Sequence, residues 1–139
     1  MKMATQPAEY EPEKPLGLVW VYCPSHPAPL ALQTGGPLEA KAHVYRGRKP
    51  PEQGPLSVVV FCPSEEDEVA SGMRNLRTLA PDAPILAFGP GDDPQFAQAA
   101  LRAGARGFVH DGMRPAQIVR EVLRVSKGEI AFPARSILF

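Results

Sequence analysis

The sequence predicts an α/β domain: a five-stranded, doubly wound parallel sheet of order 2-1-3-4-5 with helices on both faces. Three observations lead to this prediction. Short apolar runs, typical of strands buried on both faces, alternate with segments of helical periodicity. Several of these runs stop at proline or glycine, which end strands and open turns. The chain has 139 residues, 44% of them hydrophobic, which is enough for one compact core.

The N-terminal part divides into a tail and a first strand. Residues 1–15 carry prolines among charged and small residues, and we expect a flexible tail because this mixture buries little apolar surface. The folded domain is expected over 16–128, and 129–139 is interpreted as a C-terminal extension or linker. The first strand is the apolar run 16–23, which stops at Pro24.

The first crossover and the second strand are weakly marked. Three prolines and two glycines between residues 26 and 40 leave room only for a short helix, over 30–34. A second strand is expected at 42–45. The basic, Pro- and Gly-containing segment 46–51 after it is typical of a solvated loop.

The second half carries the clearest periodicity. Ser64 stands where a helix N-cap is expected, with acidic residues after it that complement the helix dipole. Asp93-Pro94 opens another helix with proline at its first position. The predicted elements are a strand at 57–62, a helix up to about residue 80, a strand at 85–88, a helix up to about Gly104, a strand at 107–110, and a helix from Pro115 to about Gly128.

Charge and composition exclude several classes of protein. Lys plus Arg and Asp plus Glu each number 15, so the formal net charge is zero. We therefore expect no direct binding of nucleic acid and no binding of a membrane by this domain, and recognition of a partner must be local. No apolar run reaches the roughly 20 residues of a membrane helix, and the start is not signal-like. A cytoplasmic protein with two free thiols is expected.

The stretch from Pro84 to Val109 resembles the second half of a bacterial response-regulator receiver domain. It contains Pro84-Ile85-Leu86-Ala87-Phe88 and an alanine-rich helix that closes on Ala103-Gly104-Ala105-Arg106-Gly107-Phe108. With a last helix ending in Lys127-Gly128-Glu129, this is similar to receivers fused to LuxR-type DNA-binding domains. The resemblance spans roughly residues 16 to 132. It implies a role in two-component signal transduction or transcription control.

Receivers of this family bind Mg²⁺ through an acidic pair after the first strand. Carried over to this sequence, the pair falls on Tyr22-Cys23 if the strand anchors the match. It falls on Pro24-Ser25 if His26-Pro27 anchors it, since that dipeptide also occurs in the family. Neither alternative supplies a carboxylate, and carboxylate oxygens are the ligands that Mg²⁺ needs.

The phosphoacceptor and switch positions of the family are also altered. The acceptor aspartate falls on Cys62, the switch hydroxyl on Gly89 and the switch lysine on His110. The resemblance therefore implies a degenerate receiver in which phosphotransfer is not expected. The nearby Asp67, Asp92 and Asp93 are interpreted as helix first-turn charges and caps rather than as a relocated acceptor.

The first strand (16–23) and the strand at 57–62, which are expected to be neighbours in the sheet, both end in the tripeptide Cys-Pro-Ser. Their ends meet at the carboxyl edge of the sheet, where open α/β sheets bind ligands. The candidate pocket at this edge consists of Cys23, Ser25, His26, Cys62, Ser64 and His110. Cysteine and histidine suit zinc, and two adjacent thiols suit a redox disulfide. Ordinary packing of small buried cysteines is favoured, because no Cys-x₂-Cys spacing is present; no metal or cofactor is predicted.

Charged residues gather where receivers commonly dimerise, on the fourth helix, fifth strand and fifth helix. The candidate interface consists of Arg102, Arg106, Arg114, Arg120, Glu121 and Arg124. Ordinary solvation of helix surfaces is the alternative interpretation.

The leading functional hypothesis is a phosphorylation-independent, receiver-like module that acts through protein contacts, as a homodimer. The alternative is a small-molecule or thiol-redox sensor that uses the strand-end pocket. An enzyme is not expected, because no nucleophile, base and orienting group stand at compatible spacing.

Overall fold

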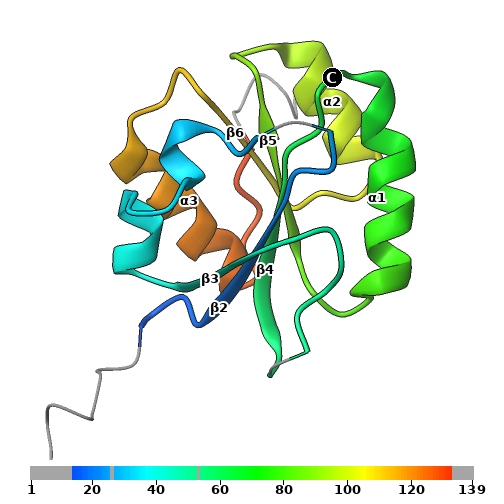
Figure 1. Ribbon diagram of the computed structural model, residues 1–139. Helices are drawn as coiled ribbons and strands as arrows, with labels where there is room; N and C mark the ends of the chain where they lie inside the picture. The colour runs from blue at the N-terminus through cyan, green and yellow to red at the C-terminus, as the bar shows by residue number, and fades with distance from the viewer. Residues whose placement is uncertain (1–13, 26, 53, 133–139) are drawn as a thin grey trace, which may run out of the picture.

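Five parallel strands form a single sheet in the computed structural model, which describes residues 14–25, 27–52 and 54–132. The strand order is β3-β2-β4-β5-β6, so the predicted 2-1-3-4-5 topology is confirmed (Figure 1). In chain order the strands are β2 (Leu18–Tyr22), β3 (His43–Arg46), β4 (Leu56–Phe61), β5 (Ile85–Gly89) and β6 (Gly107–His110). Most of the predicted tail, residues 1–13, and the end of the predicted extension, 133–139, lie outside the described residues.

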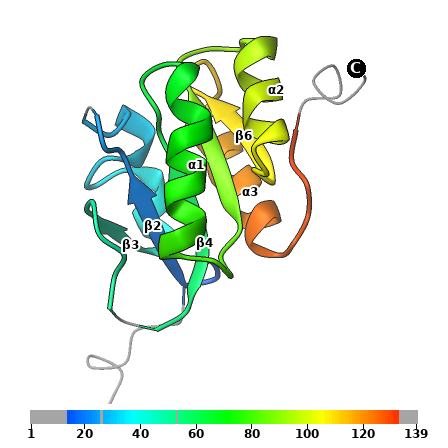
Figure 2. The ribbon, with the colours of Figure 1, turned by 90° about the vertical axis from the view of Figure 1, so that its right-hand side faces the viewer.

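Helical segments cover both faces of the sheet (Figures 1 and 2). One face carries α1 (Asp67–Leu79) and α2 (Pro94–Arg102), and the other carries α3 (Pro115–Ser126) with two short 3₁₀ helices, η1 (Leu30–Leu32) and η2 (Pro37–Ala40). Strand side chains alternate between the faces. In β4, Val58 and Val60 enter the core below α3, whereas Val59 and Phe61 enter the core below α1 and α2. None of the helices in the described part of the chain has the length and apolar character to cross a membrane.

The first crossover is built without an α-helix. The short helix expected over 30–34 is only the three-residue η1, and the four-residue η2 follows it. Two glycines separate the turns, and Gly35 has a φ of 84°, a conformation that ends a right-handed helix. Leu32 and Leu38 are nevertheless fully buried, so each turn contributes one leucine to the core.

The start of α1 corrects one expectation. Ser64 is not the N-cap, because the helix begins at Asp67 and the preceding Glu66 makes no side-chain cap bond. Instead, the backbone N–H of Ser64 donates to Oε1 of Glu68 at 2.8 Å. A carboxylate inside the first turn therefore holds the chain that leads into the helix. The Asp93 cap of α2 is confirmed, since its side chain accepts from the Gln95 N–H.

The chain after α3 returns along the outer edge of β6. Ala131 forms a parallel bridge with Gly107, and its N–H donates to the Arg106 carbonyl at 2.8 Å. The Ala131 carbonyl in turn accepts from the Phe108 N–H at 3.0 Å. Part of the edge strand is thereby paired, which protects hydrogen-bonding groups that an open edge would expose.

The close approach of α1 to the sheet predicts the effect of one substitution. A Cβ at Gly72 would overlap the Phe61 ring, which is itself fully buried. We expect Gly72→Ala to lower the free energy of unfolding by about 1–3 kcal/mol through overpacking. This cost outweighs the roughly 1 kcal/mol that alanine gains over glycine in helix propensity. Urea denaturation measures the change.

The adjacent, exposed Ser71 offers a matched control in the same helix. Ser71→Ala is expected to change stability by less than about 0.5 kcal/mol, because the side chain is exposed and its hydrogen bond, to the Glu68 carbonyl of the same helix, is long at 3.3 Å. A Gly72→Ala protein as stable as the wild type would mean that α1 does not pack against Phe61 in this way.

Candidate functional site

The carboxyl ends of the strands border a cavity of about 340 Å³. Its wall is mainly apolar, and half of the lining residues are prolines from three different loops. The lining residues are Pro27, Pro29, Pro63, Ser64, Phe88, Gly89, Pro90 and Asp111. Asp111 is the one carboxylate among them, so the cavity differs from a site built to hold a divalent cation with several oxygen ligands.

The two cysteines meet beside this edge. Tyr22 of β2 pairs with Phe61 of β4, and the N–H of Cys62 donates to the Tyr22 carbonyl at 3.0 Å. Cys23 and Cys62 follow these paired residues, and both pack against the core on the α3 side of the sheet. Both are free thiols.

The environments of the two thiols are unequal. Cys62 is 0% exposed, and burial raises the pKa of its thiol well above the usual value, with the contact to Cys23 acting in the same direction. Cys23 is only half-buried. The hydrogen bond from Cys62 lowers the pKa of Cys23, partial burial opposes this, and the Arg46 guanidinium adds to the lowering.

The two serines of the repeated Cys-Pro-Ser phrase meet at a carboxylate on α1. The Ser25 hydroxyl donates to Oε2 of Glu68 at 3.1 Å, and Oε1 of the same carboxylate accepts the Ser64 N–H. Cys62, by contrast, packs into the core on the α3 side of the sheet. The cysteines of the repeated tripeptide therefore pack against the core on the α3 side, whereas its serines bind Glu68 of α1.

His110 lies apart from the thiols. Its Nδ1 accepts from the Gly112 N–H at 3.1 Å, and its ring centroid is 6.0 Å from that of Phe108. Phe108 belongs to the core on the α1–α2 side, whereas Cys62 belongs to the opposite core. His26 lies outside the described residues. Within the described ranges, no group of three or more His, Cys, Asp or Glu side chains is placed to hold a metal ion.

Aromatic rings occupy the space beside Gly89. A Cβ at this position would stand 2.7 Å from Cε1 of Phe108 and 3.2 Å from Cδ1 of Phe96. The two rings lie 6.0 Å apart and are both almost fully buried. Sequence reasoning missed these rings and Asp111. Asp111 directly follows a strand, so its place at the strand-end edge could have been predicted from the sequence. The contact of Phe96 from α2 with the space beside Gly89 could not.

The predicted interface residues fall into three groups. Arg124 pairs within the chain, with Glu121 at 3.0 Å and Glu129 at 2.9 Å. Arg102 and Arg120 are exposed and make no side-chain bond with the described residues, and Arg114 is exposed at the start of α3. Arg106 instead lines a second cavity.

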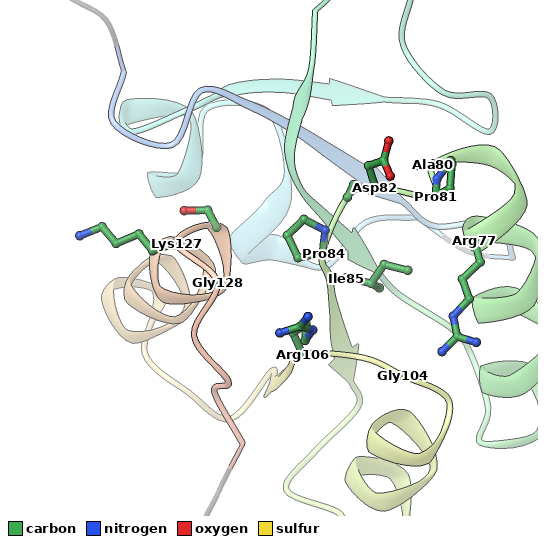
Figure 3. Close-up of a pocket in the computed structure, with 12 residues that line it drawn as sticks. Arg77, Ala80, Pro81, Asp82, Pro84, Ile85, Gly104, Arg106, Lys127 and Gly128 are labelled. Atoms are coloured by element: carbon green, nitrogen blue, oxygen red, sulfur yellow. The ribbon is translucent and has the colours of Figure 1, made fainter.

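That second cavity, of about 720 Å³, opens at the opposite edge of the sheet (Figure 3). The acidic Asp82 and the basic residues Arg77, Arg106 and Lys127 line it, and Lys127 extends away from the two arginines. Arg77 lies in the last turn of α1 and donates to the Ala103 carbonyl, and Lys127 is the C-cap of α3. Cations at helix C-termini complement the helix dipole, which accounts for two of the three positive charges without a ligand.

Comparison with known proteins identifies the fold. No family model matches the sequence, and no curated protein does. The structure matches a response regulator from Thermotoga maritima with a TM-score of 0.63 and 17% identity, covering 81% of this chain and 98% of that one. It matches the isolated REC domain of RcsB from Salmonella enterica serovar Typhimurium, solved with the phosphomimetic BeF3⁻, with a TM-score of 0.62 and 15% identity, covering 87% and 95%.

A LuxR family DNA-binding response regulator from Silicibacter pomeroyi also matches, with a TM-score of 0.58 and 18% identity, covering 87% of this chain and 99% of that one. At these identities the likeness establishes the fold. This protein has the fold of response-regulator receiver domains, as the resemblance implied.

The crowding at Gly89 yields a prediction. We expect Gly89→Ser to lower the free energy of unfolding by about 1–3 kcal/mol, because the new Cβ displaces the buried Phe108 ring. Gly91→Ser, two residues on, meets nothing within 4 Å of its Cβ. It should change stability by less than about 0.5 kcal/mol. Thermal or urea unfolding that ranks the two variants equally would contradict this packing.

Proposed function

We propose that this protein is a phosphorylation-independent, receiver-like signalling module that acts through protein contacts in bacterial signal transduction or transcription control. The observation that carries the proposal is the composition of the strand-end cavity. Where receivers present carboxylates, this chain presents four prolines, Phe88 and Gly89, with Asp111 as the one acid in the cavity wall.

The chemistry of phosphotransfer supports the proposal. An aspartyl phosphate needs a carboxylate acceptor, oxygen ligands for Mg²⁺ and a cation for the developing charge. At the inferred acceptor position stands Cys62, whose raised pKa keeps the thiol uncharged and whose burial shields it from a phosphoryl donor. At the inferred hydroxyl position stands Gly89, whose surroundings are filled by rings.

In the absence of phosphorylation, contacts between copies of the chain would transmit the signal. The exposed Arg102, Arg114 and Arg120 belong to α2 and to the start and middle of α3, and Glu121 and Glu129 lie in α3 and just after it; together with β6 these elements make up the α2–β6–α3 side. In a two-fold dimer each copy presents the same patch, so arginines of one copy can meet carboxylates of the other. We therefore propose a homodimer through this side.

A second candidate function is sensing at the strand-end edge. One observation favours it: Cys23 and Cys62 follow residues that are paired on neighbouring strands and pack against the same core, which places two oxidisable groups side by side.

Treatment with acetyl phosphate and Mg²⁺ tests the leading proposal. We expect the intact mass of the protein to stay unchanged, because Asp111 is the one carboxylate in the cavity wall and has no acidic pair beside it there to hold Mg²⁺. A receiver with an intact acidic site, treated in the same tube, serves as the positive control. A stoichiometric phosphoryl adduct, at Asp111 or elsewhere, would overturn the proposal.

Light scattering tests the dimer. We expect the wild-type protein to show twice the monomer mass, and the triple variant Arg102→Glu, Arg114→Glu, Arg120→Glu to be a monomer. The control triple, Lys41→Glu, Lys49→Glu, Arg74→Glu, makes the same charge change at exposed sites elsewhere and should remain dimeric. Dimerisation should weaken with added salt, since exposed charges are screened. A monomeric wild type, or equal dissociation of both triples, contradicts the proposed interface.

A further inference from the structure

The sheet places Cys23 and Cys62 side by side. They follow residues that are paired in register on the neighbouring parallel strands β2 and β4. Neighbouring strands lie about 4.7–4.9 Å apart, and disulfides join Cα atoms that are about 4.4–6.8 Å apart. Both cysteines pack against the same core, on the α3 side of the sheet, and the Cys62 N–H donates to the carbonyl of Tyr22, the residue before Cys23, at 3.0 Å. A disulfide between them therefore needs little movement of the backbone.

Access to the two sulfur atoms differs. Cys62 is fully buried in the core on the α3 side. Cys23 lines a surface pocket of about 190 Å³, together with Ala28, Arg46 and Arg48. A reagent from solution can therefore reach Cys23 directly but can reach Cys62 only through Cys23.

Arg46 is held rigidly at this pocket. Its Nε and Nη2 donate to the Leu32 carbonyl at 3.0 and 2.7 Å, and its Nη1 donates to Oε2 of Glu39 at 2.9 Å. A fixed guanidinium beside a thiol favours the thiolate, which is the reactive form. With Arg48 in the same pocket wall, the entrance is suited to a reagent that carries carboxylates.

We propose that Cys23 is a site of thiol–disulfide exchange with a carboxylate-bearing low-molecular-weight disulfide, and that Cys62 resolves the adduct into an intramolecular Cys23–Cys62 disulfide. This inference develops the second candidate function. It does not rest on the absence of phosphorylation, so the acetyl phosphate experiment and the one below can fail independently.

The exchange balances in two steps. The Cys23 thiolate attacks one sulfur of the reagent disulfide, the reagent S–S bond breaks, and one reagent thiolate leaves. Cys62 then gives up its proton, its sulfur attacks the Cys23 sulfur, and the second reagent thiolate leaves. The protein loses two electrons and two protons, and the reagent disulfide is reduced to two thiols.

The bond would form next to the strand-end cavity. The loop that begins after Cys23 carries Pro27 and Pro29, and the loop after Cys62 begins with Pro63; all three prolines line that cavity. A Cys23–Cys62 disulfide would therefore move the loops that carry these prolines, and with them two walls of the cavity. Oxidation would in this way change the shape of the surface at the strand-end edge.

Glutathione disulfide is the probe for the experiment, with intact mass and non-reducing peptide maps as readouts. The wild-type protein should lose the mass of two hydrogens and retain no adduct. Cys62→Ser should accumulate one mixed disulfide at Cys23, because the resolving thiol is gone. Cys23→Ser should not react while folded, although its Cys62 should react once the chain is denatured.

The charge of the entrance is tested by comparing glutathione disulfide with cystamine, a cationic disulfide. Arg48→Gln should slow the reaction with glutathione disulfide several-fold and leave the cystamine rate nearly unchanged, whereas Lys49→Gln, outside the pocket, should change neither. Two results would overturn the proposal: a wild-type protein that keeps the glutathione adduct without closing the disulfide, or equal reactivity of the folded Cys62→Ser and Cys23→Ser variants.

Discussion

The parallel pairing of β2 with β4 at the centre of the sheet is the constraint on which the rest of the structure depends. Because both strands run the same way and pair in register at Tyr22 and Phe61, the residues that follow them arrive side by side at one edge. Helices on both faces bury the strands, so neither register nor direction can change without exposing the core. The neighbouring placement of Cys23 and Cys62 and the strand-end cavity are both consequences of this pairing.

The strand-end edge is filled mainly by packed, uncharged groups. In receivers, carboxylates gathered at this edge repel one another until a cation binds. At the edge that we propose to correspond to this site lie a buried thiol at Cys62, proline rings, and the Phe96 and Phe108 rings beside Gly89. The half-buried Cys23 and the carboxylate of Asp111 are the reactive groups beside this packed space.

Much of the fold could be predicted because strands buried on both faces leave continuous apolar runs, as in β4 and β5. Less of the candidate site could be predicted from the sequence. Strand alternation directs His110 to the same side as Phe108 and away from Cys62, which a two-residue period could have indicated. The anchoring of Arg46 left no signal, because one of its partners is the backbone carbonyl of Leu32, in a crossover that lacks helical periodicity.

Titration of isotope-labelled protein with Mg²⁺ and beryllofluoride, followed by amide NMR, tests most directly whether the strand-end edge still recognises a phosphoryl group. We predict that the resonances of Cys62, Gly89 and Asp111 keep their positions throughout the titration. A saturable shift of these three resonances would show that the edge binds the phosphoryl mimic, and would contradict the account of a receiver fold that works without phosphate.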